Sequence, residues 1–244
     1  MGVRQEHLAA LQALAVERWE DYLGERSGLP GPRANLELLA AAAAGDVAPA
    51  ATLLRWSAAD DEYLACVGTA GIGRLVLEGR PALVADLRRR AEDGRWRVRE
   101  GVAMALQRIG DGDPGLLRAV TSDWAAGPPL VQRAAVAGLC EPRLLRAPGT
   151  ADHALAVLDR VTASLAALVA DRRRDPDVRV LRQGLGYCWS VAVAAAPGPG
   201  FDALERWAAS PDRDVRWVLR ENLRKARLLR ADADRTAALA VAVT

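Results

Sequence analysis

The sequence predicts an all-α protein built from repeated helix pairs, and three observations support this. Helix-forming Ala, Leu, Arg and Glu dominate the 244 residues, whereas β-branched runs are few and there is a single Phe. Amphipathic stretches alternate with breaks rich in Pro, Gly and Asp. A short phrase that opens a helix also recurs along the chain, which is typical of a helix-turn-helix repeat.

The repeated phrase is clearest at 175–179, Asp-Pro-Asp-Val-Arg, and at 212–216, Asp-Arg-Asp-Val-Arg. The aspartate before each valine is suited to accept hydrogen bonds from the unpaired N–H groups at the start of the helix. The valine should face inward, and the arginine should point outward, where it can reach an aspartate of its own or the neighbouring turn. The structural positions of these turns are Asp177, Val178, Asp214 and Val215.

Two degenerate copies lie upstream, around Val98 and Val131, which are 33 residues apart. This interval is in the range of helical-pair repeats. Arg97 stands where the aspartate would be in the first copy, and Gln132 replaces the arginine in the second. A continuous ladder of Asp/Arg pairs is therefore not expected through these copies.

The N-terminal region is expected to cap the array. Apolar residues from Leu8 to Tyr22 recur at spacings of three and four, which predicts one amphipathic helix over 4–23. A Gly- and Pro-rich break over 24–33 separates it from an alanine-rich helix over 34–44.

The next two helices are expected over 48–57 and 61–77. The second contains Gly68, Gly71 and Gly73, whose order is not the dinucleotide-binding fingerprint and which no strand precedes. We interpret these glycines as positions where helices pack closely, in preference to a nucleotide-binding loop.

Prolines and aspartates mark the boundaries that follow. The helices expected here cover 81–92, 96–109, 115–124 and 129–140. An insert over 141–150 then lengthens the repeat and leads into a longer helix over 152–170. Helices follow Val178 and Val215, and a terminal helix over 233–243 should shield the last core face.

Gly184 and Gly186 lie inside the helix that follows Val178. Each glycine costs about 1 kcal/mol relative to alanine in a helix, so a close contact should compensate. A neighbouring helix that crosses here is the favoured explanation. The alternative is a groove where a partner approaches the backbone, with Tyr187 or Trp189 on its wall.

The phrases at 175–179 and 212–216, with helix pairs of this size, resemble HEAT repeats over roughly residues 48–229. The resemblance implies a right-handed α-solenoid of about five HEAT-like helix pairs with capping helices at both ends. The expected organisation is one domain over 1–244, with an N-terminal cap and loop over 1–33, repeats over 34–230 and a C-terminal cap over 231–244. HEAT-repeat proteins include scaffolds, transport factors, enzyme-associated modules and DNA-binding proteins. The resemblance therefore implies a fold but does not specify a function.

Composition narrows the functional classes. The formal net charge is +2, and Lys225 is the only lysine. A GC-rich coding bias is a simpler explanation for the abundance of arginine than chemistry specific to arginine. The widely spaced Cys66, Cys140 and Cys188 fit small core residues in a reducing compartment. No apolar signal core or membrane-spanning run is evident, so the expected location is cytoplasmic and no membrane partner is expected.

The sequence assigns no catalytic residue, metal ligand or cofactor. His7 and His153, the only histidines, are expected to be ordinary surface residues because neither belongs to a cluster at metal-ligand spacing. A phosphate-binding loop and a nucleophile elbow are also lacking. These features favour a non-enzymatic protein.

The main binding candidate is a set of arginines on the helix after Val215. At 100° per residue, their spacing predicts one narrow stripe on that helix. The stripe comprises Arg216, Arg220, Arg224 and Arg227, and Arg179 and Arg182 lie one repeat earlier. It could neutralise phosphates, but acidic residues alternate with these arginines, so a solvated face or an ion-pair ladder is favoured.

The favoured function is a scaffold that binds another protein through distributed area and charge. The alternative is a DNA-binding or alkylpurine-glycosylase-like HEAT-repeat protein with a basic groove, which could bind nucleic acid through the arginine stripe. That alternative needs exposed tryptophans and a carboxylate in the groove, for which Asp123 beside Trp124 is the candidate. Core packing is expected to account for most of the tryptophans.

Overall fold

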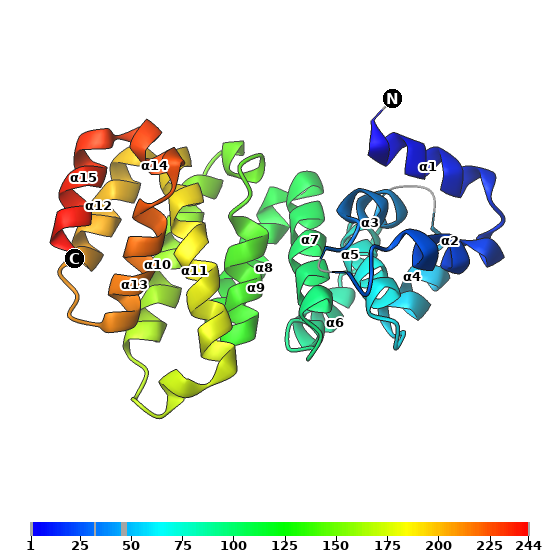
Figure 1. Ribbon diagram of the computed structural model, residues 1–244, viewed down its shortest axis with the longest axis horizontal. Helices are drawn as coiled ribbons and strands as arrows, with labels where there is room; N and C mark the ends of the chain where they lie inside the picture. Colours follow the sequence, from blue (N-terminus) through cyan, green and yellow to red (C-terminus); the bar gives the residue numbers. More distant parts are fainter. Residues whose placement is uncertain (1, 32, 45–47, 244) are drawn as a thin grey trace. The chain divides into compact units, whose positions relative to one another are not determined.

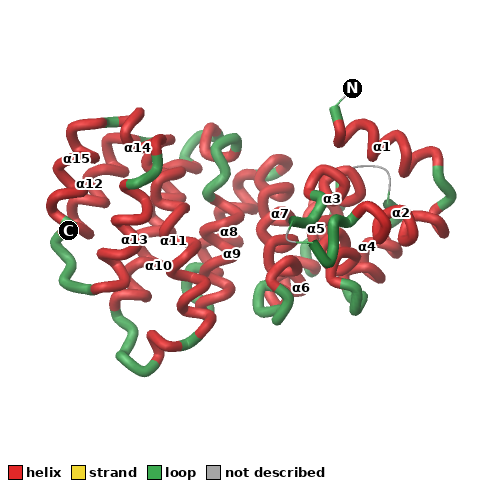
Figure 2. Tube along the Cα trace, in the orientation of Figure 1, coloured by secondary structure: helices red, strands yellow, loops and turns green. Residues whose placement is uncertain are grey.

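The computed structural model describes residues 2–31, 33–44 and 48–243. Within these ranges the protein has 15 α-helices and no strand, so the all-α prediction is confirmed (Figures 1 and 2). The chain divides into two compact units, Met1–Gly112 and Asp113–Thr244, and each has its own core. The expectation of a single domain over 1–244 stays a prediction.

The first unit is organised around α5. Its helices are α1 (Val3–Ala13), α2 (Trp19–Arg26), α3 (Leu36–Ala43), α4 (Ala50–Ser57), α5 (Glu62–Leu77), α6 (Leu83–Arg90) and α7 (Trp96–Gly112). Helix α5 packs against α2, α3, α4, α6 and α7 (Figure 1). Asp61 caps it by accepting a hydrogen bond from the Leu64 N–H at 2.8 Å, as the aspartate at this helix start predicts.

The predicted single helix over 4–23 is wrong. Helix α1 ends at Ala13, Leu14 is extended, and a short 3₁₀ turn, Val16–Arg18, leads into α2. The bend carries Trp19 into the core beside Trp56, with ring centroids 6.2 Å apart, and the Trp19 indole N–H donates to the Leu14 carbonyl. Burial of this large side chain therefore outweighs the continuous helical pattern.

The glycines of α5 are positions of close helix packing, as predicted. A Cβ at Gly68 would lie 2.1 Å from the Ser57 backbone nitrogen of α4, and one at Gly73 would lie 2.4 Å from the Ala105 carbonyl oxygen of α7. No side chain fits between these backbones. Glycine thus lets α5 contact both neighbouring helices directly.

The second unit consists of two layers of helices. They are α8 (Pro114–Trp124), α9 (Pro129–Leu139), α10 (Thr150–Ala166), α11 (Pro176–Ala195), α12 (Pro197–Ala208), α13 (Arg213–Leu223), α14 (Ala226–Ala231) and α15 (Ala233–Ala242). Helices α9, α11 and α13 pack side by side, and α8, α10 and α12 pack in the same order behind them (Figure 1). Each consecutive pair therefore repeats the arrangement of the one before.

The turn aspartates do not act as predicted. Asp175 caps α11 and Asp212 caps α13, two residues before the expected Asp177 and Asp214. Both N–H groups that Asp212 accepts, at 2.9 and 3.0 Å, belong to the first turn of α13. Val178 and Val215 are buried, so the inward orientation of the valines is confirmed.

The insert over 141–150 packs onto the unit. It contains a 3₁₀ turn, Leu144–Arg146, in which Leu144 and Leu145 are buried. The helix expected over 152–170 begins at Thr150 and ends early, at Ala166. The Arg173 guanidinium explains this end because it donates to the carbonyls of Ala166 and Leu168, which a longer helix would use itself.

None of the helices in the described ranges combines the length and the apolar character that a membrane span requires.

Candidate functional site

A cluster of ion pairs joins neighbouring turns of the second unit. The Asp214 carboxylate on α13 accepts hydrogen bonds from Arg173, in the turn before α11, at 2.8 Å and from Arg182, on α11, at 2.6 Å. Arg173 also pairs with Asp212 at 2.7 Å, and the Arg182 guanidinium lies 4.7 Å from the centre of the Trp217 ring. We call these five residues the Asp214 cluster.

The Asp214 cluster is internally neutralised. Asp214 is only 4% exposed, and burial alone would disfavour its charge. The hydrogen bonds from Arg173 and Arg182 outweigh that burial and lower the pKa of the Asp214 carboxyl below its ordinary value. A pocket of about 380 Å³ opens beside the cluster, lined also by the exposed Arg174 and Arg179.

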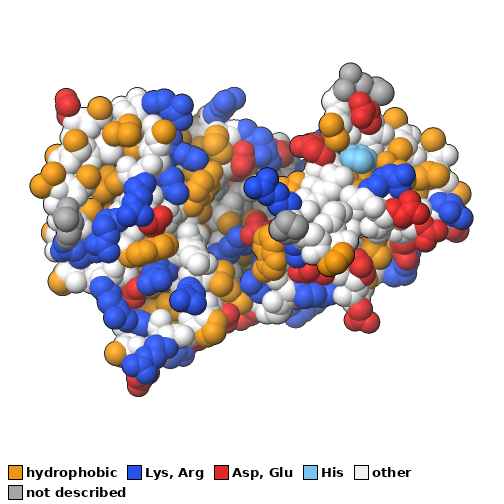
Figure 3. All heavy atoms as spheres, viewed as in Figure 1, with side chains coloured by type: hydrophobic (Ala, Val, Ile, Leu, Met, Phe, Trp, Pro, Cys, Tyr) orange, Lys and Arg blue, Asp and Glu red, His pale blue; other side chains and the backbone are white. Residues whose placement is uncertain are grey.

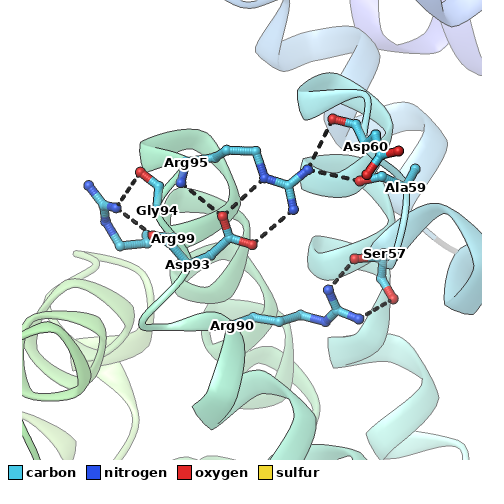
Figure 4. Close-up of polar contacts among 8 residues, drawn as sticks. All are labelled: Ser57, Ala59, Asp60, Arg90, Asp93, Gly94, Arg95 and Arg99. Atoms are coloured by element: carbon cyan, nitrogen blue, oxygen red, sulfur yellow. Dashed lines mark hydrogen bonds and ion pairs between the residues drawn. The ribbon is translucent and has the colours of Figure 1, made fainter.

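A similar arrangement ties two turns of the first unit together (Figure 4). Arg95, held by Asp93 at 2.9 Å, donates to the Ala59 carbonyl at 2.8 Å, and Arg90 donates to the Ser57 carbonyl and hydroxyl. Side-chain hydrogen bonds lower the pKa of Asp93 and raise that of Arg95. In both units, arginine side chains near one turn thus bind oxygens of an adjacent turn, a role that the sequence suggested only for the Asp/Arg pairs.

The predicted arginine stripe is not on one helix. Helix α13 ends at Leu223, Lys225 is extended, and Arg227 belongs to α14. The stripe prediction assumed an unbroken helix after Val215, and the break displaces Arg227 from the face that carries Arg216 and Arg220.

The chain itself binds two arginines of the predicted stripe. Arg220 donates to the Val243 carbonyl at 3.1 Å, Arg224 pairs with Glu221 at 2.6 Å, and Arg216 is half-buried. A binding role for the six predicted arginines stays a prediction. The structure separates them into Arg179 and Arg182 at the pocket beside the Asp214 cluster, Arg227 at a different cleft, and the remaining three on α13 or at its end.

That different cleft, which we call the Tyr187 cleft, has a volume of about 470 Å³. Three segments far apart in the sequence build it: the insert, α11 and α14. Its lining consists of Pro142, Leu145, Arg146, Tyr187, Val191, Ala194, Ala195, Arg227 and Arg230. Tyr187 is 47% exposed, and Leu145 and Val191 form a buried apolar floor.

Cations surround the Tyr187 ring. The Arg227 guanidinium lies 4.7 Å from the ring centre and donates to the Tyr187 hydroxyl at 2.9 Å. The Lys225 ammonium is 6.0 Å from the same centre. In the space-filling view, Lys and Arg side chains gather over α11, α13 and α14 on the visible face of this unit (Figure 3).

The two basic sites of the second unit differ in charge balance. In the Asp214 cluster, carboxylates bind the guanidinium groups of Arg173 and Arg182. Among the described residues that line the Tyr187 cleft none is acidic, and Arg146 and Arg230 have no ion-pair partner in the described part of the chain. The Tyr187 cleft therefore combines cations that lack carboxylate partners with an apolar floor, whereas carboxylates neutralise part of the charge at the other pocket, where Arg174 and Arg179 likewise have no ion pair among the described residues.

Asp123, the carboxylate suggested for the alternative function, is exposed on α8, and Trp124 beside it is buried. Trp124, Trp189 and Trp56 are buried in the cores, as expected for most tryptophans, and Trp96 is the one that is clearly exposed, at 51%. The carboxylate that does lie beside arginines in a pocket is Asp214, and guanidinium groups occupy both of its oxygens. Its geometry is that of a structural tie.

The histidines are half-buried, which differs from the surface positions expected of them. His7 makes a hydrogen bond to the Tyr22 hydroxyl at 3.0 Å, and His153 makes one to the Thr121 hydroxyl at 2.9 Å. Burial, with a smaller effect of the Arg118 charge, lowers the pKa of His153. Across residues 2–31, 33–44 and 48–243, no group of three or more His, Cys, Asp or Glu side chains is placed to hold a metal ion.

Sequence reasoning missed Arg146 and Arg230, which complete the Tyr187 cleft. The sequence places Arg146 in the insert and Arg230 at the end of the last repeat, and no sequence pattern connects the two. The glycines in α11 were a usable signal: a Cβ at Gly186 would lie 2.9 Å from the Trp217 ring, so the helix crossing predicted there is confirmed. Tyr187, the next residue, turns away from this crossing toward the cleft.

No protein-family model matches the chain, and a search of curated proteins finds no significant match. The HEAT-repeat resemblance therefore continues to rest on the repeated phrases of the sequence.

Proposed function

We propose that the protein is a non-enzymatic scaffold of HEAT-like helix pairs that binds another protein through the Tyr187 cleft. The observation that carries this proposal is the combination, in one cleft, of an apolar floor and arginines that have no ion-pair partner among the described residues. Such a combination of apolar area and charged rim is how protein interfaces are composed.

The packing of the second unit supports the HEAT-like part of the proposal. Helices α9, α11 and α13 form one layer and α8, α10 and α12 the other, so each pair stacks on the pair before it. Stacked pairs of this kind build α-solenoids, and their surfaces serve as extended binding sites. That the first unit is also built of HEAT-like pairs is part of the proposal.

Charge distribution favours a protein partner over nucleic acid. A nucleic-acid surface is strongly basic along a groove, because each neutralised phosphate needs a cation. Here the net charge is +2, and many arginines bind carboxylates of their own chain. Arg146, Arg227 and Arg230 border one short cleft with an apolar floor, which suits a few side chains of a protein.

A crosslinking experiment tests this function. The photoreactive amino acid benzoylphenylalanine replaces Ala194, on the cleft wall, or Ala237, exposed on α15, in the full chain. Irradiation in cells that make the protein should give a protein adduct from position 194 and not from 237. Adducts that nuclease digestion removes would instead support the DNA-binding alternative, and equal adducts from both positions would contradict the assigned cleft.

A further inference from the structure

We infer that the Tyr187 cleft binds an acidic protein segment in which an apolar side chain is flanked by carboxylates. This inference rests on the proposed function and specifies its partner. It follows from three features of the cleft: cations without carboxylate partners, an aromatic side chain held open, and a floor of small or buried apolar residues.

The cations of the cleft favour an anionic partner. Arg146 and Arg230 are exposed and have no ion-pair partner in the described part of the chain, whereas Arg173 and Arg182 of the same unit are bound by Asp214. Arginine presents planar N–H donors that match both oxygens of a carboxylate. Exposed arginines that flank one cleft are therefore suited to receive side-chain carboxylates on either side of an anchor.

The floor of the cleft requires an apolar anchor. Val191 and Leu145 are buried beneath it, and the small Ala194 and Ala195 leave its wall open. A volume of about 470 Å³ accommodates a small number of side chains, in the range of ligand-binding pockets. An aliphatic or aromatic side chain placed there would lose its own contact with water against this apolar lining.

Tyr187 positions the anchor. Its hydroxyl accepts a hydrogen bond from Arg227, and that guanidinium also lies near one side of the ring. The ring is thereby held upright at the cleft edge instead of collapsing onto α11. A partner side chain can pack against the ring while a neighbouring carboxylate meets Arg227 and Arg230.

The test uses the full-length protein and four labelled probes in fluorescence anisotropy. The probes are a twelve-residue peptide of alternating Glu and Leu, the same peptide with Ser in place of Leu, the same with Lys in place of Glu, and a twelve-nucleotide oligo-dT. The Glu/Leu peptide should bind, and both altered peptides should bind at least about tenfold more weakly. Comparable binding of the Glu/Ser peptide would show that no apolar anchor is needed, which would overturn the inference.

Charge reversal locates the site. Arg146→Glu with Arg230→Glu should weaken Glu/Leu binding at least about tenfold, since two attractive contacts become repulsive. The matched control is Arg160→Glu with Arg174→Glu, which changes the net charge equally at two exposed positions outside the cleft and should change binding less than about twofold. Circular dichroism confirms that both variants fold. Equal weakening by the two variants would mean that general charge attracts the peptide, which would overturn the inference.

The two proposals fail in different ways. A protein adduct from position 194 without preference for the Glu/Leu peptide would leave the scaffold standing and refute the acidic partner. Oligo-dT could instead bind more tightly than the Glu/Leu peptide and lose this binding in the Arg146/Arg230 variant. That result would refute both the protein scaffold and the acidic partner, and would assign nucleic-acid binding to the Tyr187 cleft. The Glu/Leu peptide with phosphoserine in place of Glu could bind more tightly and lose this binding in the Arg146/Arg230 variant. That result would support recognition of anionic side chains by the cleft.

Discussion

At the scale of single residues, Asp177 and Asp214 show how equal places in a repeated phrase acquire unequal roles. Asp177 is exposed, whereas Asp214 is buried and binds Arg173 and Arg182. The phrases at 175–179 and 212–216 are similar, and both form a turn in which a capping aspartate precedes a helix. The difference arises because the second turn has a neighbour whose arginines reach it, which no local pattern reports.

Substitution of these two aspartates is expected to have different effects. Asp214→Asn should lower the free energy of unfolding by about 3 kcal/mol, because it removes the carboxylate partner of Arg182 and leaves Arg173 with Asp212 alone. Asp177→Asn should lower it by less than about 0.5 kcal/mol, as for an exposed position. Urea denaturation followed by circular dichroism measures both. Equal losses in the two variants would show that the cluster adds nothing beyond the turn itself.

The buried cysteines should be unreactive in the folded protein. Burial raises the pKa of the Cys66 thiol to about 12, and a hydrogen bond with Cys188, together with burial, raises the pKa of the Cys140 thiol. At pH 8.5 the thiolate, which is the reactive form, is therefore rare in the native state. Iodoacetamide labelling followed by mass spectrometry should modify all three cysteines in urea and none appreciably without it. Rapid labelling of Cys66 in the native protein would show that its helix opens.

The Cys66 pKa also gives stability a pH dependence. The folded-state value lies above the ordinary value of 9.0, so the folded protein holds the thiol proton more tightly than the unfolded chain does. This contribution to stability is complete below about pH 9 and declines as the pH rises toward 12. The unfolding midpoint in urea should thus fall more steeply between pH 9 and 10.5 in the native sequence than in Cys66→Ala.

At the scale of elements, the helix boundaries show what the sequence can predict. The starts of α8, α9 and α15 lie within a residue of their predictions, because Pro and Asp act locally at a helix N-terminus. The boundaries at Leu14, Ala166 and Leu223 are incorrect, and there the chain stays apolar or helix-forming beyond the observed end. At the first two, a tertiary contact decides: burial of Trp19, and hydrogen bonds from Arg173.

The candidate site was less predictable than the helices for a similar reason. Arg227 contacts Tyr187 across 40 residues, and Arg146 comes from the insert. A helical projection could group arginines only within one helix, and the break after Leu223 invalidated that grouping. The presence of a basic surface on this part of the chain could be expected, but its floor and its rim required the packed structure.

The close packing of α5 predicts opposite effects for alanine at two helical glycines. Gly68→Ala should lower the free energy of unfolding by at least about 2 kcal/mol, because its Cβ would overlap the Ser57 backbone and the two helices would have to separate. Gly24→Ala, in α2 with no atom within 4 Å of its Cβ, should raise stability by roughly 0.5 kcal/mol. Thermal unfolding compares them. A neutral Gly68→Ala would contradict direct contact between α4 and α5.

At the scale of the whole molecule, each compact unit has a core of its own. In the second unit, Trp124, Trp189 and Phe201 are all buried, and α15 closes the end of the chain onto α12 and α13. A fragment of residues 113–244 is therefore expected to keep its helical circular dichroism and to unfold cooperatively in urea. A fragment of residues 127–244, which lacks α8, should be much less stable, because α9 then has no partner in the first helix pair. Loss of structure in the longer fragment would favour one indivisible domain.

The pairing across turns in the Asp214 cluster bears on how such a chain can change in length. Asp214 lies on α13, while its partners belong to the preceding helix and turn, so neither half of the interaction is complete within one helix pair. Deletion or duplication of a pair by recombination would create a junction with either a surplus carboxylate or surplus guanidinium groups. Viable length variants of this unit should then arise by exchange of blocks that keep donor and acceptor together.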